Sequence, residues 1–230
     1  MHRKGFTLVE LLVCIAIICL LMALLAPLIK TMRDRAKAVA CGSNLRQIST
    51  LWLMYIHEHK GYFPFRVNSV TTYRQLWGTR GVEYTCPPKL RIFGIAFPEV
   101  DVKMFHCPSD TGAGAAGWPA NRYPTLYHHA GYSYRFNTSA SNNSDKDGLF
   151  GKNIGNIGNP TEVVAAADCS FCSVYFRGDN PFQYMYWHDA GELGWGNVLF
   201  VDGSVRYLKI PDSKKFQQGP GYTFFWNGPR

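Results

Sequence analysis

The sequence predicts an α+β protein in which one long N-terminal helix packs on a small antiparallel β-sheet. Three stretches lead to this prediction. Residues 6–29 are apolar apart from Glu10, and at about 1.5 Å per residue the run is long enough to cross a hydrocarbon core of roughly 30 Å. Apolar residues then recur at intervals of three and four up to residue 56, which is typical of one helix face. Residues 197–208 have the pattern of a β-hairpin.

The apolar run is expected to insert into a membrane despite its single acid, Glu10. Fifteen Leu, Ile, Val or Phe residues each favour insertion by about 0.3 to 0.6 kcal/mol, whereas one acid at mid-membrane costs roughly 2.5 to 3.5 kcal/mol. An ionisable residue in such a segment needs a partner. Nothing within one helical turn of Glu10 is expected to pair with it, so we expect the partner to come from another molecule. Its neighbours at three and four positions are Phe6, Thr7, Val13 and Cys14.

The helix is predicted to continue beyond the apolar run, from about residue 6 to residue 60. Pro27 should kink the helix or mark a local unwinding. Gly61 is placed as a C-cap, with Pro64 just beyond it. The second half of the helix carries an apolar stripe made of Cys41, Leu45, Ile48, Trp52 and Tyr55 or Ile56.

Short strands are expected in the rest of the chain. Residues 163–168 have the composition of a buried strand, and residues 131–137 that of a strand with alternating aromatic side chains. Residues 105–110 indicate a turn that follows a short strand.

The hairpin at 197–208 is predicted to turn at Asp202-Gly203, a pair that fits a two-residue type I′ turn. In that register Phe200 faces Val205 and Val198 faces Tyr207, which makes one wholly apolar face. We expect this face to cover the long helix at Leu45, Ile48 and Trp52.

The composition indicates a packed globular domain in addition to the membrane segment at residues 6–29. Hydrophobic residues make up 47% and aromatic residues 15% of the 230 residues, which excludes a disordered chain. The net charge of +8 suits nucleic acid or anionic lipid, but Lys and Arg are scattered outside the membrane flanks, which favours a solvated surface. Charge leaves the orientation open, because basic residues flank the apolar run on both sides: Arg3, Lys4, Lys30, Arg33, Arg35 and Lys37.

Five cysteines lie outside the apolar run, so one stays unpaired unless it pairs between molecules. Cys41 on the helix and Cys107 in the 105–110 turn could form a staple between helix and domain. Cys169 and Cys172 have redox-motif spacing, but no thioredoxin-like βαβ pattern surrounds them, which favours a structural disulfide or buried thiols.

Two groups of residues could hold a metal or carry chemistry. Asn143, Asp145 and Asp147 match the opening of a calcium loop, but Ile154 takes the place of the bidentate Glu, which favours a solvated Asx-turn loop and leaves calcium binding as the alternative. His188-Asp189 could contribute to a hydrolytic or zinc site, yet no nucleophile elbow, zinc-binding helix or phosphate loop accompanies it. We therefore expect no enzymatic activity.

The segment Lys4-Gly-Phe-Thr-Leu-Val-Glu-Leu-Leu12 resembles the N-terminal signature of type IV pilins and type II secretion pseudopilins. The resemblance implies cleavage between Gly5 and Phe6 by a prepilin peptidase, and N-methylation of Phe6. It also implies that Glu10 meets the N-terminal amine of a neighbouring subunit during assembly. The short leader would stay cytoplasmic, with a single pass through the bacterial inner membrane and the remaining chain exported.

Further motifs resemble a large bacterial group of pseudopilin-like proteins. These motifs are Cys41–Ile48, Gly61–Pro64, Phe105–Asp110 and Asn197–Val205. That group has a domain named for a His, nine residues and Asp-Gly; the best match here is His188 with Asp202-Gly203, separated by thirteen residues. The resemblance implies a pilin-like architecture and secretion-type assembly rather than a chemistry. Pseudopilins of the major type also carry a calcium site in their soluble domain, so the resemblance adds some support for calcium binding by the 143–148 loop.

The expected organisation is a leader at 1–5, the transmembrane half of the helix at 6–29, its soluble half at 30–61, and a periplasmic or extracellular α+β domain at 62–230. The expected function is that of a pseudopilin-like structural subunit of a type II secretion or type IV pilus-like system. Its partners would be the prepilin peptidase, other pilin subunits and the inner membrane. The alternative is a minor pilin or surface protein whose basic, aromatic-rich head binds DNA or another ligand.

Overall fold

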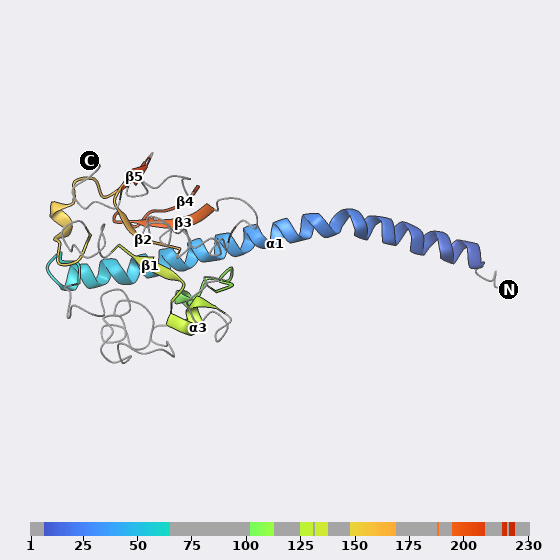
Figure 1. Cartoon of the computed structure of the whole chain (residues 1–230), viewed down its shortest axis with the longest axis horizontal. Helices are drawn as coiled ribbons and strands as arrows, with labels where there is room; N and C mark the ends of the chain where they lie inside the picture. Colours follow the sequence, from blue (N-terminus) through green and yellow to red (C-terminus); the bar gives the residue numbers. More distant parts are fainter. Residues whose placement is uncertain are drawn as a thin grey trace, which may run out of the picture. The chain divides into compact units, whose positions relative to one another are not determined.

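The computed structural model describes residues 7–64, 102–112, 125–130, 132–137, 148–168, 188, 195–209, 218–219 and 221–223. The chain divides into two compact units, residues 1–36 and residues 37–230. Helix α1, Leu8–Glu58, begins in the first unit and ends in the second (Figure 1). The architecture is α+β, as predicted: a long N-terminal helix and a small antiparallel sheet.

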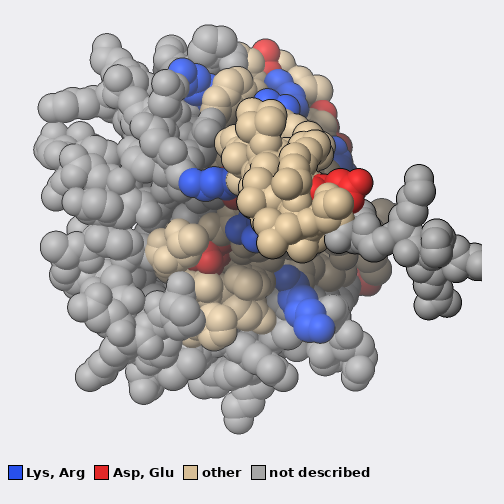
Figure 2. Space-filling model, turned by 90° about the vertical axis from the view of Figure 1, so that its right-hand side faces the viewer, with Lys and Arg blue, Asp and Glu red and all other residues tan. Residues whose placement is uncertain are grey.

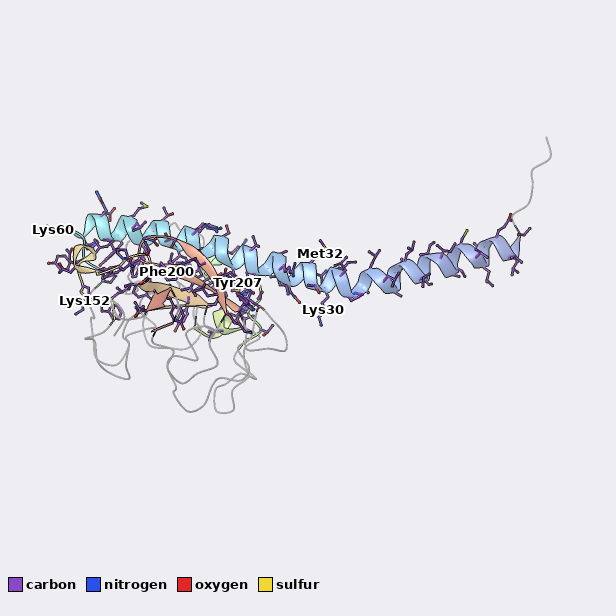
Figure 3. The ribbon with its side chains drawn as sticks, turned by 90° about the horizontal axis from the view of Figure 1, so that it is seen from above. Lys30, Met32, Lys60, Lys152, Phe200 and Tyr207 are labelled. Atoms are coloured by element: carbon purple, nitrogen blue, oxygen red, sulfur yellow. A yellow bond between two sulfur atoms is a disulfide. The ribbon has the colours of Figure 1, made fainter. Side chains whose placement is uncertain are left out.

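The first unit contains the apolar part of α1. By length and composition α1 is long and apolar enough to cross a membrane. All side chains from Leu8 to Arg33 are exposed, and Figure 3 shows them pointing outward around the helix. The helix runs through Pro27 without interruption, so the alternative of a local unwinding there was wrong. The Thr31 hydroxyl donates to the Pro27 carbonyl at 3.2 Å.

The C-terminal end of α1 is closed by Gly61, which confirms the predicted C-cap. The Gly61 N–H donates to the Ile56 carbonyl at 2.8 Å, and Gly61 has φ +85°. Such a conformation is open to glycine and strained for residues with a Cβ. A Cβ at Gly61 would also lie 3.1 Å from Asn153 Nδ2. The helix ends at Glu58, two residues before the predicted end.

In the second unit, the predicted stripe of α1 is buried in the hydrophobic core. Cys41, Leu45, Ile48, Trp52 and Ile56 all belong to the core cluster, and Ile56 rather than Tyr55 completes the stripe. The Trp52 ring meets Phe136 edge-on, with 4.0 Å between ring centroids. Since each large apolar side chain contributes about 1.5 to 3 kcal/mol on burial, this stripe fixes the second half of α1 to the domain.

Four antiparallel strands form the main sheet in the order β1-β2-β3-β4 (Figure 1). Their bounds are Tyr134–Phe136, Val164–Asp168, Trp195–Phe200 and Val205–Lys209. Strands β1 and β2 confirm the predictions at 131–137 and 163–168. The remaining elements are the 3-10 helices Val102–Phe105 and Ile154–Asn156, α3 at Leu126–Ala130, and a two-stranded sheet of β5, Gln218–Gly219, and β6, Tyr222–Thr223.

A 3-10 helix precedes the turn at 105–110, so the predicted short strand there was wrong. The turn itself is organised by Asp110, which is buried. Its Oδ1 accepts hydrogen bonds from the N–H groups of Gly112 and Leu126 at 2.8 and 2.9 Å. Its Oδ2 accepts from the Tyr127 N–H at 2.9 Å and from the Ser133 hydroxyl at 2.6 Å. One carboxylate therefore ties the turn to α3 and to the start of β1.

The hairpin β3–β4 exists, but its predicted register was wrong by one residue. Leu199 pairs with Val205 and Val198 with Arg206, and the Phe200 N–H donates to the Ser204 carbonyl at 2.9 Å, so the loop consists of the three residues 201–203 rather than two. A type I′ turn needs a positive φ at Asp202, whereas of these loop residues only Gly203 has one, at +86°. Asp202 Oδ1 instead accepts from the Ser204 N–H and hydroxyl at 2.9 and 2.7 Å.

The one-residue shift exchanges the two faces of β3 relative to β4, so Val205 faces the core as predicted but its partner there is Leu199 rather than Phe200. Leu199 and Val201 join the core cluster with the α1 stripe, and Val205 packs against it. Phe200, which was expected to face α1, is instead covered by the Arg206 guanidinium at 3.4 Å from the ring centroid. Tyr207 is 41% exposed and lies beside Trp195, with the two rings stacked.

Candidate functional site

The first candidate site is the N-terminal end of α1, where Thr7 and Glu10 form a capping box. The Thr7 N–H and hydroxyl both donate to Glu10 Oε2 at 2.8 Å, and the Glu10 N–H donates to Thr7 Oγ1 at 3.3 Å. Thr and Glu three residues apart at a helix start satisfy N–H groups that have no partner within the helix. The expectation that nothing within one turn pairs with Glu10 was therefore wrong. The spacing Thr7-x-x-Glu10 carried the signal that could have revealed this contact.

Thr7 satisfies hydrogen bonds of Glu10 but brings no positive charge. The Glu10 carboxylate lies at the start of an apolar helix, and its capping partner provides no counter-ion. The predicted processing residues Gly5 and Phe6 lie outside the described residues.

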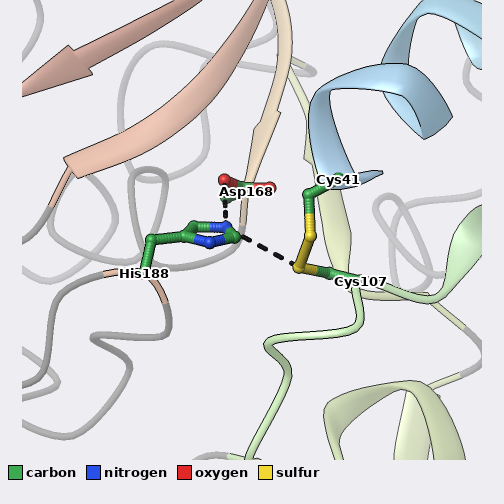
Figure 4. Close-up of side chains that lie close together, drawn as sticks. All are labelled: Cys41, Cys107, Asp168 and His188. Carbon is green, nitrogen blue, oxygen red and sulfur yellow. Dashed lines mark hydrogen bonds and ion pairs between the residues drawn. A yellow bond between two sulfur atoms is a disulfide. The ribbon is translucent and has the colours of Figure 1, made fainter. Parts of the chain in front are cut away.

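The second candidate site is a buried cluster in the domain, formed by Cys41, Cys107, Asp168 and His188 (Figure 4). Cys41 comes from α1, Cys107 from the turn after the first 3-10 helix, and Asp168 from the end of β2. The two sulfurs, one carboxylate oxygen and one imidazole nitrogen all lie within 4.8 Å of one another. All four residues are buried, so the cluster is closed to solvent.

Cys41 and Cys107 form a disulfide with their Cα atoms 5.1 Å apart. The bond closes a loop with a sequence separation of 66 residues, for which chain entropy predicts a stabilisation of about 4 kcal/mol. Neighbouring hydrogen bonds align the two segments. Asn44 Nδ2 donates to the His106 carbonyl at 2.9 Å and to the Tyr134 hydroxyl at 3.2 Å, and Tyr134 donates to the Cys41 carbonyl at 3.4 Å.

Asp168 joins β2 to β3 through one oxygen, and its partner Asn197 also reaches α1. Its Oδ2 accepts from the Asn197 N–H at 2.7 Å and from Asn197 Nδ2 at 3.3 Å. Asn197 Nδ2 also donates to the Ala38 carbonyl at 3.0 Å. Gly42 leaves room for this amide, since a Cβ there would lie only 2.9 Å from Asn197 Oδ1. The carboxylate is thus held in place by a side chain that is itself fixed on α1.

His188 faces both the carboxylate and the disulfide with the same atom. Its Nε2 lies 2.8 Å from Asp168 Oδ2 and 3.6 Å from Cys107 Sγ. Nε2 must therefore carry a hydrogen to donate to the carboxylate. Among the described residues, His188 Nδ1 and Asp168 Oδ1 are buried and have no hydrogen-bond partner. Buried polar atoms without a hydrogen-bond partner lower the free energy of unfolding, so these two atoms destabilise the domain core.

The sequence singled out His188 but paired it with Asp189, which lies outside the described residues. Asp168 and Asn197 were not singled out, because nothing local marks them: they meet each other only through the pairing of β2 with β3, and Asp168 meets His188 across twenty residues of chain. The calcium candidates Asn143, Asp145 and Asp147 also lie outside the described residues, as do Cys169 and Cys172, so these hypotheses stay predictions.

One comparison bears on the N-terminal site. Residues 1–26 match the family model of the prokaryotic N-terminal methylation motif. The chain carries a prepilin-type N-terminus. With the α+β architecture, this motif supports a type IV pilin-like protein that is processed by a prepilin peptidase and assembles with other pilins. The motif and the apolar helix are consistent with a single-pass membrane anchor, and a pilin-like motif indicates a structural subunit rather than an enzyme. No curated protein and no solved structure matches the chain.

Proposed function

We propose that the protein is a pseudopilin-like subunit of a type II secretion or type IV pilus-like system, cut after Gly5 and assembled through the N-terminal part of α1. The observation that carries the proposal is the methylation motif at residues 1–26 continuing directly into α1. An apolar helix with a processing signal at its start serves as a membrane anchor before assembly and as a packing surface afterwards.

The capping box supports a specific role for Glu10. Cleavage after Gly5 would leave the Phe6 amine one residue from Thr7. Both hydrogen bonds from Thr7 reach Glu10 Oε2, which leaves Oε1 for a donor from another molecule. An ammonium group is the natural counter-ion of a carboxylate in a medium of low dielectric constant. The Phe6 amine of a neighbouring subunit would supply that charge, so Thr7 would orient the carboxylate and the neighbour would neutralise it.

The disulfide supports export of the domain. Disulfides form and persist in oxidising compartments such as the bacterial periplasm and are rare in the cytoplasm. The Cys41–Cys107 bond joins α1 to the domain, as suits a head located in the periplasm or in an extracellular pseudopilus. We infer a cytoplasmic N-terminus and an exported domain.

A DNA-binding head is less well supported. On the face shown in Figure 2, the described Lys and Arg side chains lie in separate spots rather than in one patch. Arg206 is engaged by the Phe200 ring and the Thr161 carbonyl. Retention of the detergent-solubilised protein on DNA at low salt, lost at high salt, would revive this alternative.

Intact mass of the membrane form tests the proposal. In cells with an active prepilin peptidase we expect loss of residues 1–5 and the mass of one added methyl group on Phe6. Cells without the peptidase provide the control and should give the unprocessed chain. An unprocessed Met1 in the presence of the active peptidase would remove the processing step and with it the assembly proposal.

A further inference from the structure

We propose that the thiol form of Cys41 and Cys107 binds one Zn²⁺ together with His188 and Asp168. The proposal is independent of the pseudopilin-like function, because it rests only on the buried cluster in the domain. Two thiolates, an imidazole and a carboxylate are ligands that zinc takes in proteins, and four protein ligands make a closed structural site.

The spacing of the ligand atoms suits a tetrahedral ion. Bonds of 2.0 to 2.3 Å to zinc place ligand atoms roughly 3.3 to 3.8 Å apart. His188 Nε2 already lies 3.6 Å from Cys107 Sγ. The separation of 2.8 Å between Nε2 and Asp168 Oδ2 has to widen by about half an ångström once an ion replaces the shared hydrogen. The two sulfurs have to move apart, which loss of the bond between them allows.

The direction of the side chains points to the same conclusion. His188 presents one nitrogen to both Asp168 and Cys107, so three candidate ligands converge from three segments of the chain (Figure 4). Zinc would take Nε2, so the hydrogen of the neutral imidazole would move to Nδ1, an atom with no hydrogen-bond partner among the described residues. A cation between the two thiolates and the pair gives the buried carboxylate an opposite charge.

An outer partner for the carboxylate is already in place. Asn197 donates twice to Asp168 Oδ2 and is held by the Ala38 carbonyl on α1. Metal-binding side chains usually have such partners, which fix their orientation. Burial of all four ligand residues leaves no open position for a substrate, so the site is structural rather than catalytic.

Zinc and the disulfide exclude each other, because both use the same sulfur atoms. Cysteines enter a new chain as thiols, so the zinc form precedes the disulfide. Binding releases the two thiol protons. Oxidation by a protein disulfide then passes two electrons from the two thiolates to the oxidant, whose sulfurs take up two protons, and the ion leaves as Cys41–Cys107 forms. Zinc would thereby keep these two cysteines together while the other cysteines of the domain, Cys86, Cys169 and Cys172, are still reduced.

The test uses the full chain in detergent, reduced and kept free of oxygen, with Zn²⁺ as the only added metal. The background is a variant in which Ser replaces every cysteine outside the cluster, namely Cys14, Cys19, Cys86, Cys169 and Cys172. After desalting we expect one zinc per chain in the reduced protein and none after oxidation. Co²⁺ in place of Zn²⁺ should give the thiolate-to-cobalt charge-transfer absorption of a tetrahedral site.

Single substitutions separate the site from unspecific thiol binding. His188→Ala and Asp168→Ala should weaken zinc binding at least about tenfold, whereas His128→Ala, at an exposed histidine outside the cluster, should not change it. The oxidised forms of the variants show by circular dichroism whether each one folds. If His188→Ala fails to fold, Cys41→Ser with Cys107→Ser decides. Reduced background protein that keeps no zinc, or that keeps as much without Cys41 and Cys107, would overturn the proposal.

Discussion

Asp168 and His188 form a buried pair, with Oδ2 and Nε2 2.8 Å apart, that lies directly against the Cys41–Cys107 disulfide. The pair connects the end of β2 to a residue twenty positions further along the chain, and through Asn197 it reaches α1. The centre of the domain is therefore held by a covalent bond and a polar network at the same place.

Removing the carboxylate of this network should destabilise the domain strongly. Asp168→Ala would leave the Asn197 N–H and the His188 N–H buried without an acceptor. Breaking a buried pair by deleting one partner costs about 3 to 5 kcal/mol. Unfolding of the oxidised full chain in detergent, followed by near-ultraviolet circular dichroism, measures the loss. Glu58→Gln, at an exposed acid on α1, is the control; equal midpoints for the two variants would contradict the network.

Gly42 should resist substitution despite its position inside α1. Alanine there gains about 1 kcal/mol in helix propensity, but its Cβ would lie 2.9 Å from Asn197 Oδ1. Overpacking of this kind costs about 1 to 3 kcal/mol, so we expect a net loss in the free energy of unfolding. Ser43→Ala, at the next and exposed helix position, serves as control.

A double substitution identifies the clash as the cause. Asn197→Ala removes the atom that the new Cβ would meet. The double variant should therefore lose less free energy of unfolding than the sum of the losses in the two single variants. Additive costs would show that Gly42 matters for another reason, such as packing against Val205.

Features set by local sequence were predictable in this chain, and features set by long-range pairing were not. The buried stripe from Cys41 to Ile56 and the cap at Gly61 follow from periodicity and backbone preference within a few residues. The hairpin was found for the same reason. Its register depended on the conformation of Asp202: the Asp-Gly pair predicted a two-residue loop, and that prediction was wrong because Asp202 does not adopt a positive φ. The His188–Asp168 contact depends on a segment with no regular pattern, so sequence offered only the adjacent Asp189 as a partner.

Glu10 should be required for assembly and dispensable for membrane insertion. Glu10→Gln keeps an acceptor for the Thr7 donors but loses the charge. Since losing one partner of a buried ion pair costs about 3 to 5 kcal/mol, self-association should fall by more than about tenfold. Co-purification of tagged and untagged copies from crosslinked membranes measures this. Thr7→Ala, which weakens the cap and keeps the carboxylate, should reduce association far less; normal assembly of Glu10→Gln would leave only the anchor role.

Stability should decrease in mild acid because of His106. Burial lowers the pKa of His106 from its usual value of 6.5, Asp110 opposes the shift, and His128 adds to it. The unfolded chain therefore binds a proton at a pH where the folded chain does not. Stability from this group is complete above pH 6.5 and is lost as the pH falls toward the lower folded pKa. His106→Gln should make the thermal midpoint of the oxidised chain fall less between about pH 7.5 and pH 5.5. His57→Gln, at an exposed helix position, controls for the loss of one histidine, and a pH dependence unchanged by His106→Gln would contradict the assignment.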